Sequence, residues 1–187
     1  QAPASGQHRF VENLLALADF HARFQADGKL YTYRIHNAPH PSALYRNLTA
    51  HVPVALDDRL MHQAAQQLLG AHDFAAFAAA GGSAKTTVRT LDYLSVRREG
   101  AEIEMQVHGN AFLYNMVRII AGTLIGVGQG KLPPDCLARA LESKNRLDLG
   151  VTAPAREIPF SRTSITSSGA PGRSCSKYPP ATFTLWS

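Results

Sequence analysis

The chain has 187 residues, 45% of them hydrophobic, which is enough for one folded domain with a sizeable core. Its 19 lysine and arginine residues against 14 aspartate and glutamate residues, with a pI near 9.5, favour a polyanionic partner such as nucleic acid without requiring one. The two cysteines form no CxxC pair and have no histidine at ligand spacing, which argues against a disulfide framework or a zinc site and favours a reducing compartment such as the cytoplasm. The longest apolar stretch is interrupted by Asn115 and Arg118, so a transmembrane helix is not expected either.

The first half of the chain predicts one strand and one helix. Residues 1–18 carry no pattern that assigns a secondary structure, whereas residues 29–36, KLYTYRIH, alternate as a strand does. Tyr31, Tyr33 and Ile35 share one face of this strand, and Leu30, Thr32, Arg34 and His36 share the other. Residues 37–47 contain two prolines and predict a loop. A helix is expected from Asp57, a suitable N-cap residue, to a stop at Gly70.

The second half predicts a hairpin followed by two helices. Phe74 and Phe77 are expected to anchor the core, and His72 or Asp73 to cap the turn beside them. Residues 90–109 indicate two antiparallel strands joined around Gly100. In the stretch 110–128, a helical stripe is formed by Met116, Ile119, Ile120 and Leu124, and a shorter helix starts near Pro134. This order of elements predicts an α+β fold with a mainly antiparallel sheet flanked by helices.

Residues 156–187 differ from the rest of the chain. They are rich in serine, threonine and proline, contain one acidic residue, Glu157, and show no sustained period. We expect this tail to be poorly ordered or only partly docked.

Arg118 is the single charge in the apolar stretch 110–128. Its helical neighbours three and four residues away are Tyr114, Asn115, Ala121 and Gly122, and none is acidic, so a local ion pair does not explain it. Its stem could pack while its head reaches solvent, or it could be a fixed cation that holds a carboxylate or phosphate brought from elsewhere in the fold. The small Ala121 and Gly122 would let another element approach. Periodicity alone leaves both interpretations open.

Tyr31 is open to two interpretations as well. A tyrosine that alternates with apolar residues in a strand commonly packs in or near the core, with its hydroxyl bonded to a partner. Lys29, two residues earlier, suggests instead a ring that stacks on a base beside a cation that meets phosphate.

Five stretches taken together resemble a known family. In order and spacing they are similar to the C-terminal two-thirds of the tRNA pseudouridine synthase A family, over about residues 19–155. They read FHARFQADGKLYTYRIHN, LLGAHDFAAF, TVRTL, NAFLYNMVRIIAGTLIGVGQGK and TAPA. The resemblance implies a pseudouridine synthase-like domain that isomerises uridine in the anticodon stem-loop of tRNAs. It also implies a cytoplasmic homodimer that uses no cofactor and no metal.

The resemblance also implies residue roles. The family's reaction breaks the C1′–N1 bond of uridine and rejoins the base through C5, with an essential aspartate. Tyr31 matches the tyrosine that packs on the target base and is the candidate for proton removal at C5. Arg118 matches the arginine that pairs with the aspartate, and such a cation keeps a carboxylate ionised. The expected basic RNA-binding surface would include Arg23, Lys29, Arg34 and Arg89.

The aspartate-bearing GRTDxGVH-type motif of that family is not found in this sequence. We therefore expect a further N-terminal part, which carries the aspartate, to precede Gln1 in the native protein, and we predict that this polypeptide alone is inactive. The residues after Ala155 also depart from the short apolar strand that is usual in the family, and a shifted reading frame is one hypothesis for that change.

Two other interpretations stay open. A non-catalytic RNA-binding or dimerisation fragment would bind tRNA in a salt-dependent way without turnover. A truncated product would neither fold fully nor bind.

Overall fold

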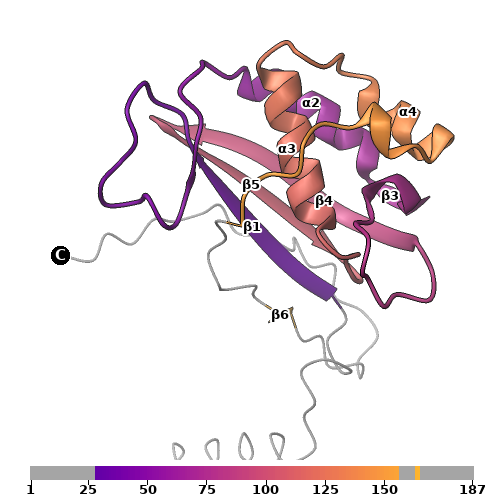
Figure 1. Ribbon diagram of the computed structural model, residues 1–187. Helices are drawn as coiled ribbons and strands as arrows, with labels where there is room; N and C mark the ends of the chain where they lie inside the picture. The colour runs from indigo at the N-terminus through magenta and orange to yellow at the C-terminus, as the bar shows by residue number, and fades with distance from the viewer. Residues whose placement is uncertain (1–27, 156–162, 165–187) are drawn as a thin grey trace, which may run out of the picture.

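The computed structural model describes residues 28–155 and 163–164 (Figure 1). The predictions for residues 1–18 and for most of the tail lie outside these ranges. Within them, a mixed sheet has the strand order β2-β1-β5-β4-β3. Its strands are β1 (Gly28–His36), β2 (Ala50–His51), β3 (Gly70–Asp73), β4 (Val88–Glu99) and β5 (Glu102–Gly109), and a short β6 (Thr163–Ser164) pairs with the start of β1.

The sheet is antiparallel except where β2 runs parallel to β1. The predicted hairpin is confirmed as β4 and β5, which meet at a turn where Gly100 has a φ of +58°. The strand predicted over residues 29–36 is confirmed as β1, which lies beside β5. The short edge strands β2 and β3 were not predicted, because two and four residues are too few to show a period.

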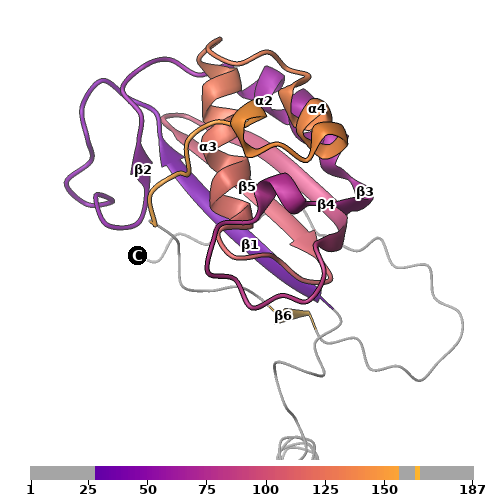
Figure 2. The same cartoon turned by 45° about the vertical axis from the view of Figure 1, so that its right-hand side comes forward.

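Three helices cover one face of the sheet in the described part of the chain (Figures 1 and 2). Helix α2 (Asp58–Ala65) begins as predicted, because the Asp57 carboxylate accepts a hydrogen bond from the Leu60 amide at 3.0 Å. It continues into a 3₁₀ turn, Gln66–Leu68, before Gly70 starts β3. Helix α4 (Cys136–Ser143) begins two residues after Pro134.

Helix α3 (Met116–Gly128) begins only after the first part of the stretch that starts at residue 110. The reason is local, since Asn115 adopts a left-handed conformation with φ of 59°, which asparagine tolerates better than most residues. The predicted stripe is confirmed: Met116, Ile119, Ile120 and Leu124 are all buried. They pack with Tyr33 and Ile35 of β1 and with the apolar residues of β4 and β5 in one core.

The core anchors after α2 are also confirmed. Phe74 and Phe77 are fully buried and meet edge to face, with ring centroids 5.4 Å apart. Asp73 caps the short turn beside them, because its carboxylate accepts from the Ala75 amide at 3.2 Å and from the Thr87 hydroxyl at 2.5 Å. These contacts fix the end of β3 to the 3₁₀ turn Ala75–Phe77 and to the residue before β4. No helix in the described ranges has the length and apolarity needed to cross a membrane.

Candidate active site

Arg118 lies in the first turn of α3 and is half-buried. Its Nε donates a hydrogen bond to the Ala153 carbonyl at 2.8 Å, and its Nη1 donates to the Asn115 side-chain oxygen at 3.0 Å. Arg118 therefore does not extend freely to solvent: two neutral acceptors fix its guanidinium. Within the described ranges, no carboxylate pairs with it.

The segment that contacts Arg118 also contacts β1. The buried Tyr33 donates its hydroxyl hydrogen bond to the Pro154 carbonyl at 2.8 Å. The Ala153 amide donates to the Arg118 carbonyl at 3.0 Å, so Ala153 is bonded to Arg118 in both directions. Residues 153 and 154 thus join the start of α3 to the middle of β1, and they bring together elements that are distant in sequence.

Small residues on α3 make this approach possible. A Cβ atom at Gly122 would collide with the Val151 carbonyl and would lie 2.9 Å from the Ala153 amide. The expectation that Ala121 and Gly122 admit another element is confirmed for Gly122, and the element is the segment 151–153.

Tyr31 points to the same face of β1 as Tyr33, because the two residues are separated by one position in a regular strand. Its ring is partly buried against the core and meets Phe112 edge to face, with centroids 6.0 Å apart and an interplanar angle of 78°. Packing holds the ring without burying it completely. Of the two interpretations of Tyr31, half-core packing is therefore confirmed, and stacking on a base stays a prediction.

The candidate RNA contacts that the structure describes do not all lie on one face of the sheet. Arg23 lies outside the described residues. Lys29 shares the Tyr31 face of β1 by alternation, whereas Arg34 lies on the opposite face and forms an ion pair with Glu104 at 2.9 Å. Arg89 lies on β4, opposite His72 of β3, and donates through its Nη1 to the Val88 carbonyl at 2.6 Å. The RNA-binding role of each stays a prediction.

Sequence reasoning missed three members of this site. Tyr33 was assigned only to a strand face, Asn115 only to the neighbourhood of Arg118, and Pro154 to no role within the quoted TAPA stretch. The contact between Tyr33 and Pro154 spans 121 residues, so no local period could indicate it. In the described ranges, no group of three or more potential ligand side chains is placed to hold a metal ion.

A family profile described as tRNA pseudouridine synthase matches residues 64–160. The chain belongs to this family of RNA-modifying isomerases. It is 50% identical over 140 residues to tRNA pseudouridine synthase A of Acetivibrio thermocellus, which covers 75% of this chain and 57% of that protein.

Two further relatives carry the same name. The protein of Paramagnetospirillum magneticum is 45% identical over 151 residues, covering 81% of this chain and 59% of the relative. The protein of Geotalea uraniireducens is 44% identical over 165 residues, covering 84% and 68%. The chain thus spans little more than half the length of most of the curated relatives it matches.

Proposed function

We propose that this chain supplies the tyrosine and the arginine of a tRNA pseudouridine synthase that isomerises uridine in the anticodon stem-loop of tRNA. The observation that carries the proposal is the joining of α3 and β1 through residues 153 and 154, which places Arg118 and Tyr31 on elements fixed to one another. Family membership supplies the reaction class.

Arg118 has the hydrogen-bonding capacity that this role needs. A guanidinium has five N–H donors, and the described residues use one at Nε and one at Nη1. The remaining N–H groups, including both at Nη2, could donate hydrogen bonds to a carboxylate in the bidentate geometry that arginine favours. Such a pair keeps the carboxylate ionised when bound RNA excludes water, since a nearby cation lowers a carboxyl pKa.

Tyr31 would contribute through its ring and its hydroxyl. Packing against Phe112 orients the ring, which lowers the entropic cost of holding it beside a base. In the proposed step, the C1′–N1 bond of uridine breaks, the base rejoins C1′ through C5, and Tyr31 assists removal of the C5 proton. The aspartate of the reaction would come from a part of the protein outside these 187 residues.

The test uses a chimera in which residues 28–155 replace the aligned segment of the Acetivibrio thermocellus relative. We expect the chimera to form pseudouridine in unmodified tRNA and the 187-residue chain alone to form none. Tyr31→Phe and Arg118→Gln should each lower the chimera's rate by about 100-fold or more, the usual scale for loss of a proton-transfer or charge-stabilising group.

Two matched variants serve as controls. Tyr114→Phe removes a hydroxyl from an exposed tyrosine, and Arg139→Gln removes a charge from an exposed arginine on α4, so both should retain the activity of the chimera. A chimera that binds tRNA without turnover would favour the non-catalytic RNA-binding or dimerisation interpretation. Turnover by the 187-residue chain alone would show that the proposed need for an external aspartate is wrong.

The proposal also includes a homodimer acting in the cytoplasm. Both features rest on the family resemblance, and the mass of the active chimera in solution tests the first of them.

A further inference from the structure

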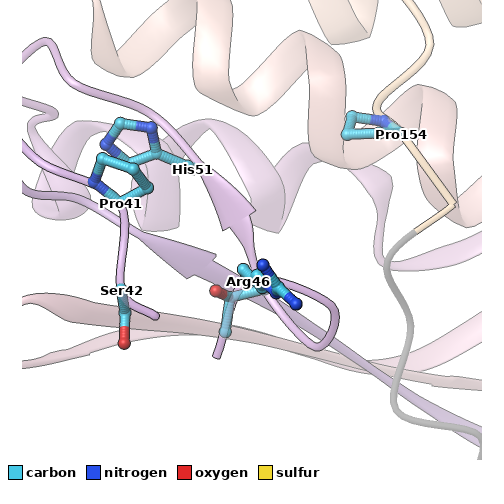
Figure 3. A pocket seen from close by; sticks show the side chains of 6 residues that line it. Pro41, Ser42, Arg46, His51 and Pro154 are labelled. Atoms are coloured by element: carbon cyan, nitrogen blue, oxygen red, sulfur yellow. The ribbon is translucent and has the colours of Figure 1, made fainter. Parts of the chain in front are cut away.

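A pocket of about 390 Å³ lies between the loop that follows β1 and the segment after α4 (Figure 3). Its lining is made by Pro41, Ser42, Arg46, Thr49, His51 and Pro154. This volume falls within the range of pockets that hold small organic ligands, and it exceeds the volume that a single inorganic anion requires. It has room for a nucleotide unit.

Arg46 and Ser42 supply the available donors of this pocket, because the Thr49 hydroxyl already donates to the Tyr45 carbonyl at 3.1 Å. Arg46 has no hydrogen bond or ion pair to any described residue, so its full guanidinium is available. His51 donates from Nε2 to the Ala38 carbonyl at 2.8 Å, which fixes the ring at the pocket wall. The Ser42 oxygen accepts from the Tyr45 amide at 3.3 Å, so its hydroxyl proton remains free to donate. None of the described lining residues is a carboxylate, and the guanidinium of Arg46 among them favours an anion.

The loop that forms the pocket is anchored at its base. The Asn37 side-chain amide donates to the carbonyls of Val52 and Val54 at 2.9 and 2.7 Å. Arg98 donates to the Asn37 side-chain oxygen at 3.0 Å and to the Leu56 carbonyl at 2.7 Å. These bonds tie the start of the loop to the chain that follows it, and a fixed base reduces the ordering cost of binding a ligand to the loop.

The pocket adjoins the candidate active site through Pro154. This residue lines the pocket, and its carbonyl is the acceptor of the Tyr33 hydroxyl. The preceding carbonyl, that of Ala153, holds Arg118. A nucleic-acid strand with one base at Tyr31 and Arg118 would therefore carry a neighbouring phosphate toward Arg46.

We infer that this pocket binds a backbone phosphate of the RNA substrate, next to the target uridine, with Arg46 as its principal contact. The inference rests on the proposed function. The size of the pocket and its place beside Pro154 favour a polynucleotide phosphate over a free phosphate ion.

The test measures tRNA binding by the 187-residue chain and by Arg46→Ala over a range of salt concentrations. Loss of one phosphate contact should weaken binding by about 3- to 10-fold at moderate salt and reduce the slope of log K against log salt by about 0.7 to 1. The matched control is Arg139→Ala, which removes the same charge from an exposed position on α4, away from the loop (Figure 1). It should retain both the affinity and the slope. Arg46→Lys should retain most of the slope, because the charge remains.

Each outcome of this experiment supports or overturns the phosphate site. If Arg46→Ala binds tRNA as the unmodified chain does, or if both alanine variants lose affinity equally, the phosphate site is wrong while the proposed function stands. If inorganic phosphate binds in an Arg46-dependent way and tRNA binding does not depend on Arg46, the pocket serves a small anion and the inference is overturned. If the unmodified chain binds no tRNA, the phosphate site is wrong, and the activity of the chimera decides the proposed function separately.

Discussion

Asp73 shows how single contacts hold the layers of this fold together. Its carboxylate forms an ion pair with Lys144 at 2.7 Å and also accepts from Thr87 and from the Ala75 amide. The Lys144 ammonium and the Thr87 hydroxyl lower the pKa of this carboxyl below its ordinary value of 3.8. The residue thereby links the end of β3 to the residue that follows α4.

Asp73→Asn should destabilise the chain in a pH-dependent way. A carboxyl whose pKa is lower in the folded state binds protons more weakly there, so its contribution is present above pH 3.8 and is lost as the pH falls through the folded-state pKa. Urea unfolding at a series of pH values measures this. The difference between the original chain and the variant should persist at neutral pH and shrink in acid.

The control is Asp135→Asn, because Asp135 is exposed and its side chain does not cap α4. That variant should show no comparable acid-dependent difference. A difference for Asp73→Asn that grows as the pH falls would contradict the assignment.

At the scale of elements, the packing of α3 depends on Gly122, which faces the backbone of residues 151–153. Gly122→Ala should destabilise the chain by about 1–3 kcal/mol, because the new methyl group would overlap the Val151 carbonyl and backbone cannot move aside as a side chain can. Denaturant unfolding measures the loss. The variant should also weaken the hold of Ala153 on Arg118, and so lower the activity of the chimera.

Gly126→Ala is the matched control in the same helix. The atoms nearest to its added Cβ belong to the Leu132 side chain, the closest at 2.8 Å, and a helix propensity gain of about 1 kcal/mol offsets the adjustment. We expect a change near zero. Equal destabilisation of the two variants would show that packing against segment 151–153 is not the cause.

The elements that the sequence predicted are those with a sustained period. Helix α2, helix α3 and the β4–β5 hairpin repeat their apolar residues over several turns or alternations. Strands β2 and β3 have no such length, and tertiary pairing alone defines them. The left-handed conformation of Asn115, after which α3 begins, could not be predicted either, since asparagine is common in many loops.

At the scale of the whole molecule, the described residues share one connected core, which runs from Tyr33 in β1 to Ala153 after the last helix. We expect the 187-residue chain to unfold in one cooperative transition, because no part of this core is separate from the rest. Thermal melts followed by far-ultraviolet and near-ultraviolet circular dichroism should coincide. A broad or probe-dependent melt would favour the interpretation of an incompletely folded product.

The candidate site was predictable only in part, because several of its contacts join residues that are distant in the sequence. Arg118 could be singled out because a lone charge beside small residues is unusual in an apolar helix, and the close approach of another element is confirmed at Gly122. Its acceptor, Ala153, lies 35 residues away, and Arg46 lines the same pocket as Pro154 although it comes from a distant loop. Such contacts follow from topology, and one sequence without its fold does not indicate them.

The link that residues 153 and 154 form between α3 and β1 determines which sequence changes the family should tolerate at these positions. The acceptors that residues 153 and 154 give to Arg118 and Tyr33 are both peptide carbonyls, which every amino acid supplies. Side chains at these two positions can therefore change without removing the acceptors. Inserting or deleting one residue before them would instead shift both carbonyls out of reach, so natural variation here should tolerate changes of residue type far better than changes of length.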